Sequence, residues 1–266
     1  MLLGKLGRRK IMKAVILAGG KGTRISEESK IRPKPMVEIG GFPILWHIMK
    51  TYEKFGINEF VICCGYKGQM IKDYFINYMR YRDNIHTDLG ADNTKSLSGH
   101  MEKWKVTLVD TGYNTLTAGR IKQIQKYVEG EKFFLTYGDG VSDINLNQLL
   151  DFHNQKGKTV TISLIKPAGR FGGAIVEEKT GEIHGFKEKA REDQSWVNMG
   201  YMVMEPSVFD YLGDGTEMLE AGPFERITLA GEMNGFCHNG FWAPMDNVHD
   251  RDYLEHLWNT LEAPWK

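Results

Sequence analysis

The stretch Met12–Met36, MKAVILAGGKGTRISEESKIRPKPM, decides how this chain folds. Its apolar run Ala14–Ala18 predicts a buried β-strand that leads directly into a glycine-rich loop. A strand that ends in glycines presents bare backbone N–H groups at the carboxyl edge of a sheet, where an anionic ligand can approach closely. The residues that we expect to contact such a ligand are Gly19, Gly20, Gly22, Thr23, Arg24 and Lys34.

A glycine turn flanked by two solvated basic side chains would be the simpler explanation. Here three glycines, a hydroxyl and an arginine stand together, and prolines on both sides fix the chain around Lys34, so the loop suits a nucleoside triphosphate. The loop lacks the lysine followed by serine or threonine that defines a P-loop. The third position of the dinucleotide pattern G-x-G-x-x-G falls on Ile25, which argues against a dehydrogenase.

A second apolar strand, Phe133–Thr136, runs into Tyr137-Gly138-Asp139-Gly140. Open α/β sheets bind ligands outside the carboxyl ends of their strands, so Gly138 is a candidate for nucleotide contact. A carboxylate at that edge would repel a triphosphate unless a divalent cation lay between them. Asp139 is therefore a candidate Mg²⁺ ligand, and an Asx-type turn is the alternative.

Mg²⁺ usually binds one or two carboxylates together with water and phosphate oxygens, so a second aspartate should lie on a later loop. Asp246 follows the aromatic pair Phe241-Trp242 and precedes a C-terminal helix that carries Tyr253 and Leu254. Considered alone, Asp246 is better explained as the N-cap of that helix.

Composition limits the class of protein. Lys plus Arg (34) equals Asp plus Glu (34) over 266 residues, so no overall charge attracts nucleic acid or an anionic membrane. No apolar run approaches the ~20 residues that span a bilayer. The three cysteines lack zinc-site spacing, so we expect a reduced, cytoplasmic protein without a structural metal. The eight histidines form no metal-spaced cluster, and we expect no catalytic role for them.

Short apolar strands alternate with amphipathic helices, which predicts an α/β fold: a Rossmann-like mixed, mostly parallel sheet with helices on both faces. Helices are expected at 43–55, 68–81 and 120–128, and closely spaced strands after residue 159 should add antiparallel pairs to the sheet. The polar region 84–104 lacks periodicity and is interpreted as an excursion or contact arm. We interpret 12–266 as a single domain and 1–11 as an extension, either an expression remnant or an alternative start.

The order of these motifs resembles that of the sugar-nucleotide pyrophosphorylases, also called sugar-1-phosphate nucleotidyltransferases. The resemblance rests on L-A-G-G-x-G-T-R after the first strand, on P-K-P-M and on the late W-x-x-M-D, and it covers nearly all of Met12–Lys266. It implies the nucleotide-diphospho-sugar transferase type of fold. It also implies catalytic roles for Arg24, Lys34 and Asp139, with Mg²⁺ bound by Asp139 and Asp246.

Two further patches gain a role only from the resemblance. Gly185-Phe186-Lys187-Glu188-Lys189 matches the family's F-x-E-K-P, with Ala190 in place of the proline, and alone would be an ordinary charged strand end. The match implies that Glu188 binds sugar hydroxyls, that Lys189 binds the sugar phosphate, and that Asn198 hydrogen-bonds the sugar. The turn V-D-T-G followed by T-x-G-R implies that Thr111, Gly119 and Arg120 contact the nucleotide or the acceptor.

Several segments, among them Y-G-D-G-V and C-C-G-Y-K-G, resemble the cytidylyltransferase branch of this family, which makes CDP-glucose. This implies Mg²⁺-dependent in-line transfer from CTP to α-D-glucose 1-phosphate, supply to surface polysaccharide synthesis, and a homo-oligomer, either tetramer or hexamer. Thymidylyl- and uridylyltransferases share the opening motif. A non-catalytic sugar-nucleotide sensor would share the fold, so both alternatives stay open.

Overall fold

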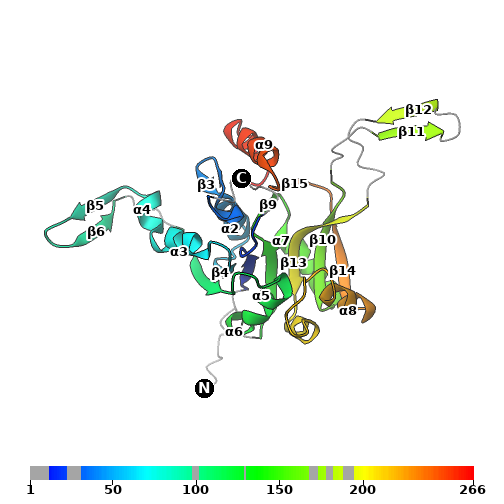
Figure 1. Cartoon of the computed structure of the whole chain (residues 1–266), viewed down its shortest axis with the longest axis horizontal. Helices are drawn as coiled ribbons and strands as arrows, with labels where there is room; N and C mark the ends of the chain where they lie inside the picture. The colour runs from blue at the N-terminus through cyan, green and yellow to red at the C-terminus, as the bar shows by residue number, and fades with distance from the viewer. Residues whose placement is uncertain are drawn as a thin grey trace, which may run out of the picture.

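The computed structural model describes residues 12–22, 31–97, 102–128, 130–167, 173–177, 182–187 and 195–266. Its centre is a seven-stranded sheet. The strands of this sheet are β1 (Ala14–Leu17), β4 (Glu59–Cys64), β7 (Lys105–Asp110), β8 (Phe133–Tyr137), β10 (Val160–Ile165), β13 (Val197–Met204) and β14 (Met233–His238). They lie in the order β14-β10-β13-β8-β1-β4-β7 (Figure 1).

Pairing within the sheet is mostly parallel. β1 is parallel to both of its neighbours, β4 and β8. The pairs β4–β7 and β10–β14 are also parallel. β13 runs antiparallel to β8 and to β10, so it is the strand that makes the sheet mixed. The predicted mixed, mostly parallel sheet is confirmed.

Helices pack on both faces of the sheet. They are α2 (Ile44–Glu53), α3 (Gly68–Ile76), α4 (Tyr78–Arg82), α5 (Thr117–Gln123), α6 (Gln125–Val128), α7 (Leu146–Lys156), α8 (Pro223–Leu229) and α9 (Val248–Asn259), with 3-10 turns η2 (Lys34–Met36) and η3 (Pro206–Tyr211). In the described part of the chain, none of these helices is both long enough and apolar enough to cross a bilayer.

Alternate residues of β1 enter two separate hydrophobic cores, as expected for a strand that is buried on both sides. Ala14 and Ile16 join the core on the side of α2, α7 and α9, whereas Val15 and Leu17 join the core on the side of α5, α6 and α8. This explains why the decisive stretch is a continuous apolar run and not an alternating pattern.

Three segments differ from the sequence predictions. The helix expected over 68–81 is divided at Asn77, whose φ of −99° and ψ of 15° leave the helical region. Region 84–104 contains a hairpin of β5 (Ile85–Asp88) and β6 (Asn93–Ser96), which escaped prediction because its residues are polar on both faces. β11 (Gly173–Glu177) and β12 (Glu182–Lys187) pair with each other in a sheet of their own and do not extend the main sheet.

Two small antiparallel pairs shape the functional edge. β2 (Glu38–Ile39) pairs with β3 (Phe42–Pro43) directly before α2. β9 (Gly140–Ser142) pairs with β15 (Trp242–Pro244), and the backbone N–H of Met245 donates to the carbonyl oxygen of Asp139 at 2.8 Å. This second pairing brings two segments that are about a hundred residues apart to the same end of the sheet.

The three cysteines are free thiols in different surroundings. Cys63 and Cys64 are buried in β4, whereas Cys237 in β14 is exposed. Burial raises the pKa of Cys63 to about 12 and that of Cys64 to about 11.

Candidate active site

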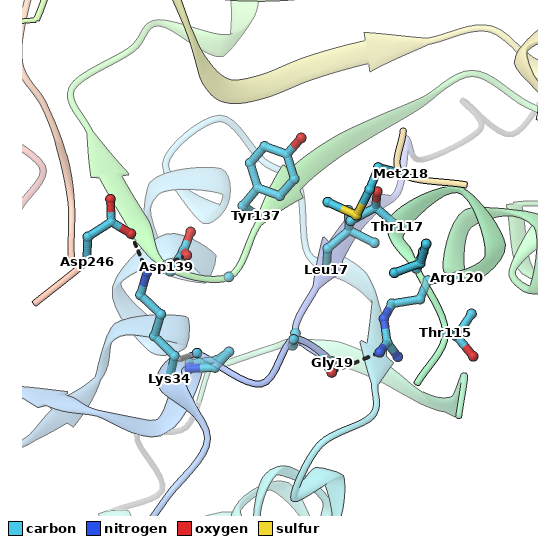
Figure 2. Close-up of a pocket in the computed structure, with 16 residues that line it drawn as sticks. Leu17, Gly19, Lys34, Thr115, Thr117, Arg120, Tyr137, Asp139, Met218 and Asp246 are labelled. Atoms are coloured by element: carbon cyan, nitrogen blue, oxygen red, sulfur yellow. Dashed lines mark hydrogen bonds and ion pairs between the residues drawn. The ribbon is translucent and has the colours of Figure 1, made fainter. Parts of the chain in front are cut away.

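A cavity of about 320 Å³ lies at the carboxyl ends of β1 and β8 (Figure 2). Eight of the residues singled out from the sequence line it: Gly19, Gly20, Gly22, Lys34, Arg120, Gly138, Asp139 and Asp246. Further lining residues were not predicted, and they include Thr115, Leu116, Thr117, Tyr137 and Met218.

Lys34 is held in the turn η2, between Pro33 and Pro35. The backbone N–H of Met36 closes this turn on the carbonyl oxygen of Pro33 at 2.8 Å. Lys34 is only 8% exposed, and its side chain extends toward two carboxylates (Figure 2). Its Nζ donates to Oδ2 of Asp139 and to Oδ1 of Asp246, each at 2.8 Å.

The two aspartates therefore converge, as the sequence predicted. Because both oxygens lie 2.8 Å from one nitrogen atom, they are separated by no more than twice that distance. Asp246 is not the N-cap of α9. Asn247 takes that position and forms a capping box with Asp250, and the N–H of Asp246 donates to Asp250 at 2.8 Å.

Burial and the carboxylates act on the charge of Lys34 in opposite directions. Burial disfavours the ammonium form, but the charges of Asp139 and Asp246 and the hydrogen bonds to them outweigh it. The pKa of Lys34 is consequently raised above its ordinary value, so this side chain is a permanent cation at neutral pH.

The donor set also fits Mg²⁺. Two carboxylates face the cavity, and Mg²⁺ is usually bound by one or two carboxylates while substrate phosphates and water supply the remaining ligands. Among the described residues there is no group of three or more His, Cys, Asp or Glu side chains that could form an all-protein metal cage. The arrangement therefore suits an ion that enters together with a phosphate ligand.

Close packing explains two of the glycines that line the cavity, Gly19 and Gly138. A Cβ atom on Gly19 would lie 2.2 Å from Nη1 of Arg120, and one on Gly138 would lie 3.0 Å from the carbonyl oxygen of Leu17. Among the residues that the structure describes, a Cβ on Gly20 would meet nothing within 4 Å. Gly20 therefore faces open space, where a ligand can approach its backbone.

Arg120 lies beneath the cavity and binds main-chain groups. It is 4% exposed, and its guanidinium donates to the carbonyl oxygens of Gly19 (2.9 Å), Cys64 (3.2 Å) and Gly112 (2.9 Å). A fourth bond goes to the hydroxyl of Thr111 at 2.6 Å. These contacts join the ends of β1, β4 and β7.

Three other predicted residues lie away from the cavity lining. Thr111 is 1% exposed and donates to the carbonyl oxygen of Cys64 at 2.6 Å. Gly119 packs against Gly215, and Asn198 Oδ1 accepts from the N–H of Gly200 at 2.9 Å. The structure thus gives each of them a contact within the protein, and ligand contact stays a prediction. Thr23, Arg24, Glu188 and Lys189 lie outside the described residues.

Comparison with known proteins identifies the class of protein to which this fold and this cavity belong. Residues 13–233 match the model of the nucleotidyl transferase family. The chain is 46% identical over 256 residues to the glucose-1-phosphate cytidylyltransferase of Salmonella typhimurium, across 96% of this chain and 99% of that protein. The protein belongs to the nucleotidyl transferase family.

Solved structures agree on the fold. HddC from Yersinia pseudotuberculosis complexed with GMP-PN is 21% identical with a TM-score of 0.67, across 93% of this chain and 99% of that chain. UDP-glucose pyrophosphorylase complexed with UDP-glucose is 17% identical with a TM-score of 0.66, across 94% and 99%. At these identities the likeness shows the nucleotidyltransferase fold alone.

Proposed function

We propose that this protein transfers a cytidylyl group from CTP to α-D-glucose 1-phosphate, giving CDP-glucose and pyrophosphate. The observation that carries the proposal is the convergence of Lys34, Asp139 and Asp246 beside the glycine-rich loop. The 46% identity to a glucose-1-phosphate cytidylyltransferase over nearly the whole length of both chains supports the choice of substrates.

The reaction needs two polyanions to be held together. An oxygen of the sugar phosphate attacks the α-phosphorus of CTP, and the bond to the departing pyrophosphate breaks. No general base is required, because a phosphate monoester with a second pKa of about 6 is largely ionised at pH 7. The protein has to position the reactants and stabilise the charge that builds on the leaving group.

Each element of the site has a part in that task. The open space at Gly20 lets phosphate oxygens approach backbone N–H groups. Lys34, a permanent cation, faces the α-phosphate region. Asp139 and Asp246 would hold Mg²⁺, which would neutralise phosphate charge and orient phosphate oxygens. Arg24 on the pyrophosphate, and Glu188 and Lys189 on the sugar phosphate, complete the proposal from the family resemblance.

We also propose that the protein is a homo-oligomer, a tetramer or a hexamer, and that the β5–β6 hairpin contacts a second copy. The hairpin projects from the body (Figure 1), and Leu89 at its turn is 90% exposed. An isolated two-stranded hairpin is at best marginally stable in water, so a neighbouring subunit would give it a surface to pack on. Sedimentation of a variant lacking 85–97 should show a smaller assembly, and an unchanged one would contradict this role.

The decisive test is pyrophosphate release with glucose 1-phosphate and Mg²⁺, run in parallel with CTP, UTP, dTTP and ATP. Selective activity with CTP supports the proposal, and activity with UTP or dTTP would move the protein to the uridylyl- or thymidylyltransferases. No release from folded protein would favour a sugar-nucleotide sensor. Asp139→Asn and Lys34→Ala should lower turnover by orders of magnitude, whereas Asp151→Asn, an exposed change on α7, should not.

A further inference from the structure

Tyr137 occupies a junction in the cavity that the mechanism above does not use. It directly precedes Gly138 and Asp139, and Figure 2 shows it between Asp139 on one side and Met218 on the other. The ring packs on β13, where a Cβ atom on Gly200 would lie 2.5 Å from Cδ2 of Tyr137. Gly200 also has a φ of +85°, so glycine is required there on two grounds.

The hydroxyl of Tyr137 connects the end of β8 to a distant segment. It donates to Oε1 of Glu220, and Oε2 of Glu220 accepts from the hydroxyl of Thr117 at 3.4 Å. The hydroxyl of Thr117 in turn accepts from the N–H of Leu219 at 2.6 Å. A tyrosine phenol is protonated at neutral pH, so the Tyr137 hydroxyl donates to the Glu220 carboxylate.

These bonds fix segment 213–222, which connects η3 to α8 and carries Met218. Met218 is 45% exposed although it lines the cavity, so burial of its own side chain does not determine its position. The attachments that flank it do so instead: the carbonyl oxygen of Glu217 accepts from the N–H of Ala118 at 3.3 Å on one side, and Leu219 and Glu220 are bound on the other. Within this set, the bond between Tyr137 and Glu220 ties the cavity wall to the end of β8.

The wall lies at the end of the cavity away from the two aspartates. Lys34, Asp139 and Asp246 are at one end, and Thr115, Thr117 and Met218 are at the other (Figure 2). Arg120 also lines this second end, where its guanidinium donates to main-chain carbonyl oxygens. Phosphate groups belong at the end that holds Lys34 and the aspartates. The opposite end offers hydroxyl groups and apolar surface, the combination by which pockets hold a planar ring and fix its orientation.

We propose that Tyr137 and Glu220 form a clasp that holds Met218 against the base of the bound nucleotide, so that Tyr137 is a positioning residue for nucleotide affinity. The inference rests on the proposed function, since it takes a nucleotide as the ligand. It adds a determinant of base binding that lies outside the glycine-rich loop. Without the phenol hydroxyl, segment 213–222 would lose its attachment to β8 while the Lys34–Asp139–Asp246 group stayed in place.

The test compares Tyr137→Phe and Glu220→Gln with the wild-type protein. The KM for CTP should rise about tenfold, the effect of one hydrogen bond to a charged group, while kcat and the KM for glucose 1-phosphate stay within about twofold. Glu225→Gln, a change at an exposed glutamate on α8, is the matched control and should behave as wild type. Met218→Ala should raise the same KM, and the double variant with Tyr137→Phe should raise it less than the product of the two.

A second measurement does not depend on activity. Hydrogen–deuterium exchange of segment 213–222 should be faster in Tyr137→Phe, while exchange in β4 is unchanged. Unaltered exchange in 213–222 would overturn the clasp even if no nucleotide proved to be a substrate. A lower melting temperature with both KM values and kcat unchanged would also overturn it, because it would leave Tyr137 with a merely structural role.

Discussion

Replacing Arg120 by methionine separates a structural role from a ligand-binding one. Methionine keeps the length of the side chain but removes the four hydrogen bonds that join the ends of β1, β4 and β7. Two of the carbonyl acceptors keep another donor: Gly19 accepts from the N–H of Tyr66 at 3.1 Å, and Cys64 from that of Thr111 at 2.9 Å. Gly112 is the carbonyl that loses its described side-chain donor.

The expected magnitude follows from this inventory. A hydrogen bond to a charged group contributes about 1.5–3 kcal/mol, and the retained donors limit the loss to one or two such bonds. We therefore expect the free energy of unfolding of Arg120→Met to fall by about 3 kcal/mol. For a chain of this size that corresponds to roughly 10 °C in melting temperature.

Urea unfolding followed by circular dichroism measures the loss, and calorimetric titration with CTP measures nucleotide affinity in the same variant. Arg120→Lys should lose less stability than Arg120→Met, because its ammonium group still donates to some of the four acceptors. An unfolding free energy equal to that of the wild type, together with a large loss of CTP affinity, would refute this reasoning. It would show that Arg120 contributes to nucleotide binding and not to the stability of the loops that it joins.

Three further outcomes are expected. Burial lowers the pKa of His47 to about 4 from 6.5, so below pH 6.5 the unfolded chain binds a proton that the folded chain does not. The free energy of unfolding should therefore fall by roughly 3 kcal/mol between pH 6.5 and 4. Urea unfolding at several pH values should show a smaller pH dependence of this free energy for His47→Gln. Gly119→Ala would place Cβ 2.3 Å from a backbone oxygen and should cost about 1–3 kcal/mol in thermal unfolding, whereas Gly20→Ala, in open space, should not lower the melting temperature. Asp246→Asn should lower pyrophosphate release by at least about a hundredfold with little change in melting temperature, as expected for the loss of a charge that acts on the transition state.

The strands β1 and β8 and the loops that follow them could be predicted from the sequence, because each depends on residues that are adjacent in the chain. A parallel strand buried on both faces needs a continuous apolar run, and its carboxyl end needs small residues where a ligand approaches, so β1 and β8 could be located with their loops. The convergence of Asp139 and Asp246 was also predicted, but through family resemblance. The β9–β15 pairing that produces it joins short segments with no pattern of their own.

Long-range contacts of polar side chains were not predictable. The sequence around Arg120 is basic and lies at the start of a predicted helix, which is compatible with a nucleotide contact. Nothing in it shows that the guanidinium donates to three main-chain carbonyls. Tyr137 was interpreted only as the residue that follows an apolar strand, since its partner Glu220 lies 83 residues away. β14 was missed because its sequence, MNGFCH, contains a glycine and alternating polar residues and lacks a clear apolar face.

The distribution of the three thiols has a practical consequence for spectroscopy. Maleimide and other thiol reagents attack thiolates, and the raised pKa and burial of Cys63 and Cys64 leave Cys237 as the thiol that is reactive in the folded state. A fluorophore can therefore be attached to β14 at the end of the sheet without replacing any residue. The two buried thiols lie in β4 between β1 and β7. The rate at which a thiol reagent modifies them therefore measures how often that part of the sheet opens.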